Sequence, residues 1–195
     1  MTATRSGESE ITLDKITAAA LQVFMRYGVQ RSSMNDIAVE AGLARQTLYK
    51  TYPNKDAILC ATIRVQSEVI RQQMLAAWQR APGVEAQMDV FFDIAILASF
   101  DVIRASPHAA DMVDGFSEKG RAEITKVQQT VAADLAQILT AVGPQLRGAG
   151  TSPEAYARFL QQAALGLRNA AENRVQLLAM LQDLKRSALA LMQPE

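Results

Sequence analysis

Apolar residues recur at three- and four-residue steps along almost the whole chain, and this spacing is typical of amphipathic helices. The run from Glu118 to Val142 illustrates it, with Ile124, Val127 and Val131 on one face. No segment has the strict alternation of apolar and polar residues that a half-buried strand requires. Apolar residues make up 49% of the 195 residues and charged residues 21%, which suffices for a packed core. We therefore expect an all-α protein.

Composition and charge argue against several classes of protein. The 20 basic and 20 acidic side chains cancel, so any nucleic-acid site must depend on local charge. With one cysteine (Cys60) and one histidine (His108), we expect no disulfide framework, metal site, cofactor or catalytic constellation. The first ten residues do not resemble a secretory signal, and the most apolar run, 90–100, is too short to span a bilayer. These features predict a cytoplasmic protein that is not an enzyme.

Residues 33–55 carry the pattern that is most informative about function. A short helix is expected over Met34–Ala41 with Ser33 as its cap, and Gly42 permits the left-handed backbone of a sharp turn. A second short helix is expected over Ala44–Tyr49. Two helices joined in this way form a helix-turn-helix, whose second helix lies in the major groove of DNA.

Polar side chains on the second of these helices suit contacts with DNA. Arg45, Gln46 and Thr47 lie at its N-terminal end, where Arg can pair with guanine, Gln with adenine and the Thr methyl group with thymine. Phosphate contacts are expected from the cap and from the hydroxyl and amino groups that follow: Ser33, Tyr49, Lys50, Thr51, Tyr52 and Lys55. The alternatives are that Ser33 is only a cap and that the two tyrosines are core aromatics. Five basic and two acidic residues within 26–55 give this segment a charge of +3.

The same segment resembles the N-terminal domain of TetR/AcrR-family transcriptional regulators. It has a first helix ending in FMRYG, followed by SSMNDIAVEAGLARQTLYKTYPNKDAIL, and the resemblance covers about residues 12–59. The resemblance implies a dimeric repressor whose C-terminal domain binds a small effector. By position it assigns Arg45, Gln46 and Thr47 to bases. The resemblance also assigns contacts with the DNA backbone to Ser33, Tyr49 and Lys55. Lys50-Thr51 stands where an aromatic residue or His is common in the family, and Tyr52 stands where Phe is usual.

Longer helices are expected after residue 54. Their predicted bounds are Lys55–Arg80, Val84–Ala105, a short helix from Ser106 to about Asp114, Glu118–Val142, Pro153–Ala171 and Glu172–Met192, with a loop over Gly143–Pro153. The first helix of the chain is expected to begin near Thr12 or Asp14. We predict a helix-turn-helix domain over residues 1–54 and a larger effector-binding and dimerisation domain over residues 55–195.

Large apolar side chains of the C-terminal part could line a pocket for a small apolar effector or simply fill a core. The candidates, with the single histidine, are Trp78, Met88, Phe91, Phe92, Phe100, His108, Met112 and Phe116. Asp93 and Asp101 are the expected polar groups in or beside this pocket.

The last two expected helices carry more apolar surface than one neighbour can cover. Such a width suggests one face against the chain's own core and another against a second copy, although a purely internal bundle would have similar helices. The candidate dimer residues are Tyr156, Phe159, Ala163, Leu167, Leu177, Leu181, Leu184 and Ala188.

These observations predict a homodimeric regulator of transcription that binds double-stranded DNA at a palindromic operator and is released by an effector. The competing hypothesis is a helical-bundle effector-binding or scaffold protein without DNA binding. The surface over residues 44–55 discriminates between them, because substitutions there change sequence preference only in a DNA-binding protein.

Overall fold

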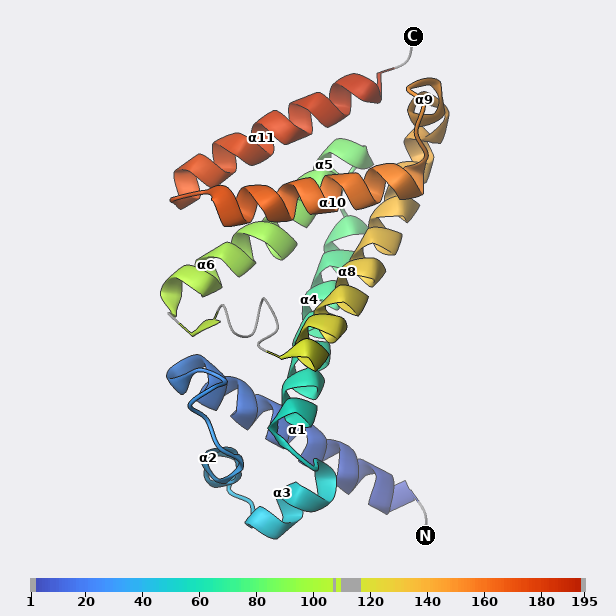
Figure 1. The fold of residues 1–195 in the computed structure, drawn as a ribbon. Coiled ribbons are helices and arrows are strands. Elements are labelled where there is room, and N and C mark those ends of the chain that lie inside the picture. Colours follow the sequence, from blue (N-terminus) through green and yellow to red (C-terminus); the bar gives the residue numbers. More distant parts are fainter. Residues whose placement is uncertain (1–2, 107, 110–116, 194–195) are drawn as a thin grey trace. The chain divides into compact units, whose positions relative to one another are not determined.

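The computed structural model describes residues 3–106, 108–109 and 117–193, with side chains from residue 12 onward. All regular elements in these ranges are helical, which confirms the predicted all-α class (Figure 1). In chain order they are α1 (Ala3–Tyr27), α2 (Met34–Glu40), α3 (Arg45–Thr51), α4 (Lys55–Trp78), α5 (Gly83–Phe91), the π-helical turn η1 (Phe92–Leu97), α6 (Ala98–Ala105), α8 (Glu118–Leu139), the 3-10 turn η2 (Thr140–Val142), α9 (Gly143–Gly148), α10 (Pro153–Ala170) and α11 (Arg174–Leu191).

Contacts divide the chain into two compact units. The first contains residues 1–68 and 103–125, and the second contains residues 69–102 and 126–195. Helices α4 and α8 each contribute residues to both units. The predicted domain boundary after residue 54 coincides with the start of α4, and it stays a prediction of where the N-terminal domain ends.

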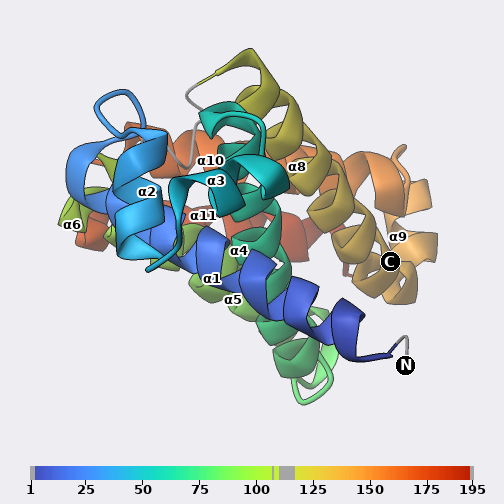
Figure 2. The same ribbon diagram turned by 90° about the horizontal axis from the view of Figure 1, so that it is seen from below.

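The core of the first unit forms where α1 packs against α2 and the following helices. Ile16, Phe24 and Ile37 are fully buried there, together with Leu48 of α3 and Leu59 of α4. Figure 2 shows α2 lying against α1, with α3 following it after a short turn. This small core fixes the angle between α2 and α3.

The second unit is held by a larger apolar core. Side chains of α5, η1 and α6 pack against α10 and α11, and Met88, Phe91 and Leu177 are almost completely buried among them. Helices α10 and α11 run side by side in Figure 1. The predicted helices over 153–171 and 172–192 correspond to these two elements within a few residues.

Three local differences from the sequence expectations have physical causes or consequences. Helix α1 begins at Ala3 rather than near Thr12. The run predicted as one helix from Val84 to Ala105 is continuous but contains the π-helical turn η1, which shifts the register of the residues after it. The segment after Gly143 is not only a loop, because Pro144 suits the first turn of a helix and buried Leu146 anchors that helix, α9, to the core.

Candidate nucleic-acid interface

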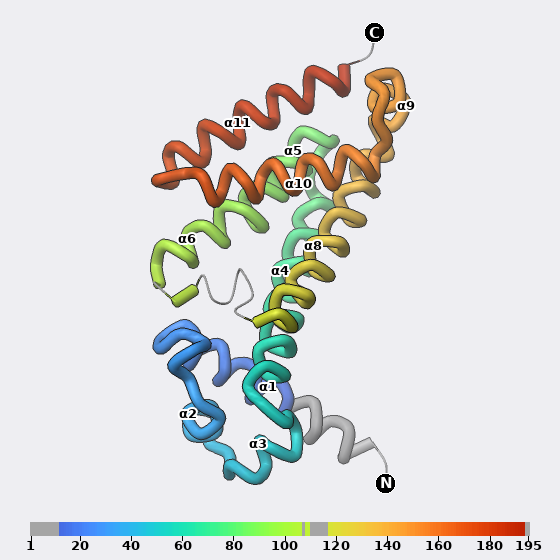
Figure 3. Tube along the Cα trace, in the orientation of Figure 1, coloured from blue at the N-terminus to red at the C-terminus, as the bar shows by residue number. Residues whose placement is uncertain are grey.

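The turn between α2 and α3 has the geometry that the sequence predicts. Gly42 has a φ of +60°, a left-handed conformation that residues with a Cβ rarely adopt. The Leu43 amide donates to the Ala38 carbonyl at 2.9 Å and the Gly42 amide to the Val39 carbonyl at 3.0 Å. Figure 3 traces the short connection between α2 and α3. Together with the burial of Leu48, this turn sets the orientation of α3.

Helix α3 presents one continuous polar face to solvent. Leu48 has no exposed surface, whereas the other residues of its first two turns are exposed: Arg45, Gln46, Thr47, Tyr49 and Lys50. The structure therefore brings together five of the nine residues predicted to contact DNA. Thr51 and Tyr52, which end the helix, are half-buried, and burial raises the pKa of the Tyr52 hydroxyl. Tyr52 thus combines a packed ring with partial access to solvent.

Arg45 and Tyr49 form a pair on the exposed face of α3. The guanidinium carbon of Arg45 lies 5.4 Å from the centre of the Tyr49 ring, and Arg45 Nη2 lies 3.5 Å from the Tyr49 hydroxyl oxygen. Residues four apart on a helix are neighbours, so this contact follows from their spacing. It limits the conformations of a long side chain, which would lower the entropy lost on contact with a partner.

Ser33 and Asp36 form a capping box at the start of α2. The Ser33 hydroxyl accepts from the Asp36 amide at 3.2 Å and donates to Asp36 Oδ2 at 2.7 Å, while the Ser33 amide donates to the same oxygen at 2.8 Å. The hydrogen bond from the Ser33 hydroxyl lowers the pKa of the Asp36 carboxyl most, and the bond from the Ser33 amide lowers it further. Ser33 therefore caps the helix, and its hydroxyl proton is already donated to a carboxylate.

Lys55 occupies an unexpected position in this unit. Its ammonium group donates to the carbonyl oxygens of Val29 at 2.6 Å, Ser32 at 2.8 Å and Gln30 at 3.2 Å. The sequence analysis assigned this ammonium group to a phosphate of the DNA backbone. The structure supplies internal acceptors instead, on a segment that lies more than twenty residues earlier.

The predicted effector residues are not gathered at one site. Five of them, Trp78, Met88, Phe91, Phe92 and Phe100, are buried in the apolar core of the second unit, where the Trp78 indole donates to the Gln87 carbonyl at 2.7 Å. His108 belongs to the first unit, and Met112 and Phe116 lie outside the described residues.

A groove of about 430 Å³ opens beside His108 in the first unit. Its lining residues are Val23, Arg26, Tyr27, Arg31, Asp36, Val39, Glu40 and His108. Arg26 lies over the ring of Tyr27 and forms an ion pair with Glu40 at 3.7 Å. The hydroxyl of Ser106 donates to the Met25 carbonyl at 2.9 Å and so ties the segment after α6 to α1.

The polar groups inside the second unit also differ from those expected. Asp93 and Asp101 are both exposed, and Asp101 pairs with Arg174 at 3.2 Å, so neither lies inside the apolar core, and a position beside a pocket stays a prediction. Gln161 and Arg168 of α10 are among the buried polar residues of this unit, and Arg168 donates to the Ser99 hydroxyl at 3.3 Å. No signal in the sequence separates these two side chains from the solvent-facing polar residues of the same helix.

The predicted dimer residues fall into two groups. Tyr156, Leu177, Leu181 and Ala188 are covered by the chain itself and retain almost no surface for a partner. Phe159 is 58% exposed, and Ala163, Leu167 and Leu184 are half-buried. Val175 and Leu191 of α11, which were not on the predicted list, are also exposed.

A short turn followed by a helix with an exposed polar face is the arrangement of a helix-turn-helix, and comparison with known proteins agrees. Residues 16–62 match the family model of bacterial regulatory proteins, tetR family. The uncharacterised HTH-type transcriptional regulator YezE of Bacillus subtilis is 26% identical over 154 residues, which cover 76% of this chain and 79% of YezE. Residues 16–62 thus form a DNA-binding domain of the tetR family, and the chain as a whole is similar to an HTH-type transcriptional regulator.

Solved structures share this fold. A TetR-family regulator from Pectobacterium atrosepticum matches with a TM-score of 0.67 and 20% identity, over 97% of this chain and 98% of that one. The regulator FadR from Bacillus subtilis, solved in complex with stearoyl-CoA, matches with a TM-score of 0.63 and 18% identity, over 88% and 95%. No helix in the described part of this chain is long and apolar enough to cross a membrane.

Proposed function

We propose that this regulator is a non-enzymatic, cytoplasmic repressor that binds a near-palindromic operator as a homodimer. The observation that supports this proposal most directly is the face of α3 that carries Arg45, Gln46, Thr47, Tyr49 and Lys50 on the solvent side of a buried Leu48. Two copies of this helix related by two-fold symmetry would read half-sites about 34 Å apart. In this proposal, residues 1–54 bind DNA and residues 55–195 carry effector binding and dimerisation.

The dimer surface that we propose lies on α10 and α11. Phe159, Val175 and Leu191 expose large apolar side chains there, at 58%, 77% and 45%. Apolar surface of this kind is typical of homodimer interfaces. The half-buried residues Ala163 and Leu167 on α10 would extend the same surface.

The effector that we propose is a small apolar molecule that enters the second unit. The support is the concentration of aromatic and methionine side chains around Trp78, Met88 and Phe92. Stearoyl-CoA, which is bound to the similarly folded FadR, carries an apolar chain of the kind that such a core could accept. An effector of this type would release DNA by binding better to the state in which the two α3 helices are wrongly spaced.

Selection from a randomised duplex library at near-physiological salt tests DNA recognition. The proposal expects enrichment of an inverted repeat by the wild-type protein, and loss of that preference in Arg45→Ala and Gln46→Ala. Arg80→Ala is the matched control, because Arg80 is exposed and lies outside the helix-turn-helix. A protein that remains dimeric but enriches no sequence would instead support a helical bundle that does not bind DNA.

A further inference from the structure

The segment between α1 and α2 is organised around a positive charge that comes from another helix. Gly28 ends α1 with a φ of +81°, and the chain then reaches the α2 cap at Ser33. The carbonyl oxygens of Val29, Gln30 and Ser32 all face one point, where they accept hydrogen bonds from the Lys55 ammonium. We call this arrangement, residues 28–33 with Lys55, the Lys55 clamp.

All three N–H groups of the Lys55 ammonium are engaged in the clamp. A lysine has three donors and no acceptor, and the three distances of 2.6, 2.8 and 3.2 Å account for each donor once. Hydrogen bonds from a charged donor are stronger than those between neutral groups. A phosphate could therefore be contacted only at the expense of one of these internal bonds.

A second side chain, that of Ser32, also stabilises this segment. The Ser32 side chain is buried, and its hydroxyl donates to the Gly28 carbonyl at 2.6 Å. This bond closes residues 28–32 into a compact turn, while the Ser32 carbonyl is held by Lys55. Two independent side chains, Ser32 and Lys55, thus hold the turn by hydrogen bonds.

The start of α2 depends on this turn. Ser33 follows Ser32 directly, and the α2–α3 pair is rigidly joined through the turn at Gly42. Lys55 is also the first residue of α4, so the clamp joins the beginning of α4 to the beginning of α2. A loss of the clamp would let the α2 cap move relative to the helix that supports it.

We propose that Lys55 is a positioning residue for DNA binding rather than a phosphate contact: it fixes the α1–α2 turn and hence the placement of the helix-turn-helix. The proposal rests on the DNA-binding role of the domain and not on the repressor mechanism. It also accounts for a lysine at the first position of a helix, because the three carbonyl dipoles offset the unfavourable helix-dipole contact there.

Salt dependence separates positioning from direct contact. Each phosphate that a protein neutralises contributes about −0.9 to the slope of log K against log salt concentration. Lys55→Met keeps the apolar stem and removes the charge, and we expect it to weaken binding roughly tenfold at every salt concentration, as if one charged hydrogen bond were lost, with the slope unchanged. Lys50→Met is the matched control, because Lys50 is exposed on α3 and should show a smaller slope.

The experiment measures binding of full-length protein to the duplex that the wild type selects, at several salt concentrations, with helicity and the thermal midpoint recorded for each variant. Ser32→Ala loosens the same turn without changing any charge, so it should also weaken binding with an unchanged slope. Lys55→Arg should retain part of the affinity, because a guanidinium can still donate to the carbonyls.

Two outcomes would overturn the proposal. A slope reduced by about 0.9 per protomer in Lys55→Met would show that Lys55 contacts a phosphate. Unchanged affinity in folded Lys55→Met, with only the thermal midpoint lowered, would show that the clamp is merely structural. A wild-type protein that selects no duplex would count against the proposed operator, and the salt series on a duplex of arbitrary sequence would then test Lys55 separately.

Discussion

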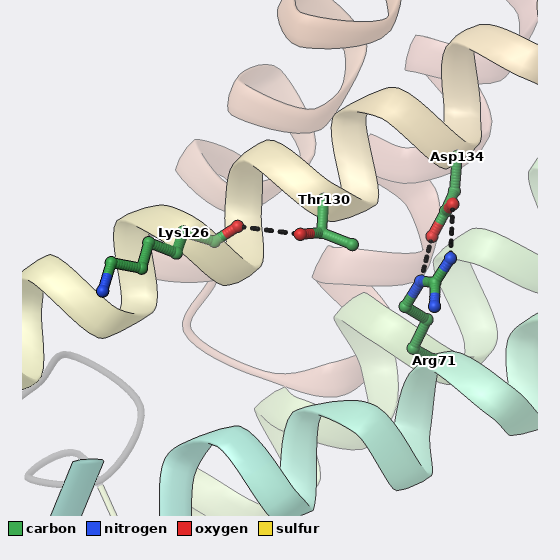
Figure 4. Close-up of polar contacts among 4 residues, drawn as sticks. All are labelled: Arg71, Lys126, Thr130 and Asp134. Carbon is green, nitrogen blue, oxygen red and sulfur yellow. Dashed lines mark hydrogen bonds and ion pairs between the residues drawn. The ribbon is translucent and has the colours of Figure 1, made fainter. Parts of the chain in front are cut away.

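The ion pair between Arg71 and Asp134 allows a quantitative test of how far burial strengthens an interaction in this fold. Arg71 of α4 approaches Asp134 of α8 with two parallel hydrogen bonds, Nε to Oδ2 at 2.6 Å and Nη2 to Oδ1 at 3.0 Å (Figure 4). The Asp134 side chain is only 6% exposed and that of Arg71 is 28% exposed. The substitution Arg71→Met would leave a buried carboxylate without this partner.

The expected cost of Arg71→Met follows from that burial. Breaking a fully buried pair from one side costs about 3–5 kcal/mol. Because more than a quarter of the Arg71 side chain reaches solvent, we expect a smaller loss of unfolding free energy, about 2–3 kcal/mol. The double variant Arg71→Met with Asp134→Leu removes both charges, and it should recover to within about 1 kcal/mol of the wild type.

Urea denaturation followed by circular dichroism measures these differences, at one fixed protein concentration because dimer stability depends on concentration. Arg64→Met is the matched control. Arg64 joins the same two helices through one hydrogen bond to Glu123 at 2.9 Å, and the Glu123 side chain is 9% exposed, close to the value for Asp134. The two pairs therefore differ mainly in the cation: the Arg64 side chain is 65% exposed, so solvent already screens its charge, and its loss should cost only about 1 kcal/mol. Equal small losses in both variants, with no recovery in the double variant, would refute the argument from burial.

Three further substitutions test other parts of the structure. Ser33→Ala should cost about 1 kcal/mol through the lost cap. Asp36 has a lowered pKa in the folded state, so it stabilises that state at pH values above its ordinary pKa, and this contribution is lost as the pH falls through the folded-state pKa. Ser33→Ala should therefore also reduce the loss of stability below about pH 4, measured by urea midpoints. Leu48→Ala in the fully buried position of α3 should cost about 2–4 kcal/mol by thermal unfolding, and a loss below about 1 kcal/mol would contradict its packing. Phe159→Glu should shift the protein to monomers in sedimentation while Val69→Glu, another exposed apolar site, should not; dimers in both would place the interface elsewhere.

The helix-turn-helix could be predicted because its signals are local. A glycine at position 42, a capping serine at 33 and an inward leucine at 48 act within a stretch of sixteen residues, and the structure uses each of them as expected. The segment after Gly143 shows the limit of this approach. Its glycines and prolines predict a loop, but the burial of Leu146 depends on a core that the local sequence does not describe.

Periodicity predicts which residues share a helix face but not what covers that face. Leu177 and Phe159 were both expected at a dimer surface, yet Leu177 has no exposed surface and Phe159 is 58% exposed. The residues that pack against α11 come from the neighbouring α10 and also from α5 and η1, more than seventy positions earlier than α11. Separating the two kinds of apolar residue therefore requires the tertiary structure.

Net charge has the same limitation, as the segment 26–55 demonstrates. Its sum of +3 is correct, but the sum does not locate the charge. Arg26 pairs with Glu40 and Lys55 is held by three carbonyls, so the basic side chains on the exposed face of α3 are Arg45 and Lys50. Two lysines five positions apart thus have different roles, because one faces solvent and the other faces backbone oxygens that are distant in sequence. The sequence gives the number of cations, and only the fold decides whether each one faces solvent or an internal acceptor.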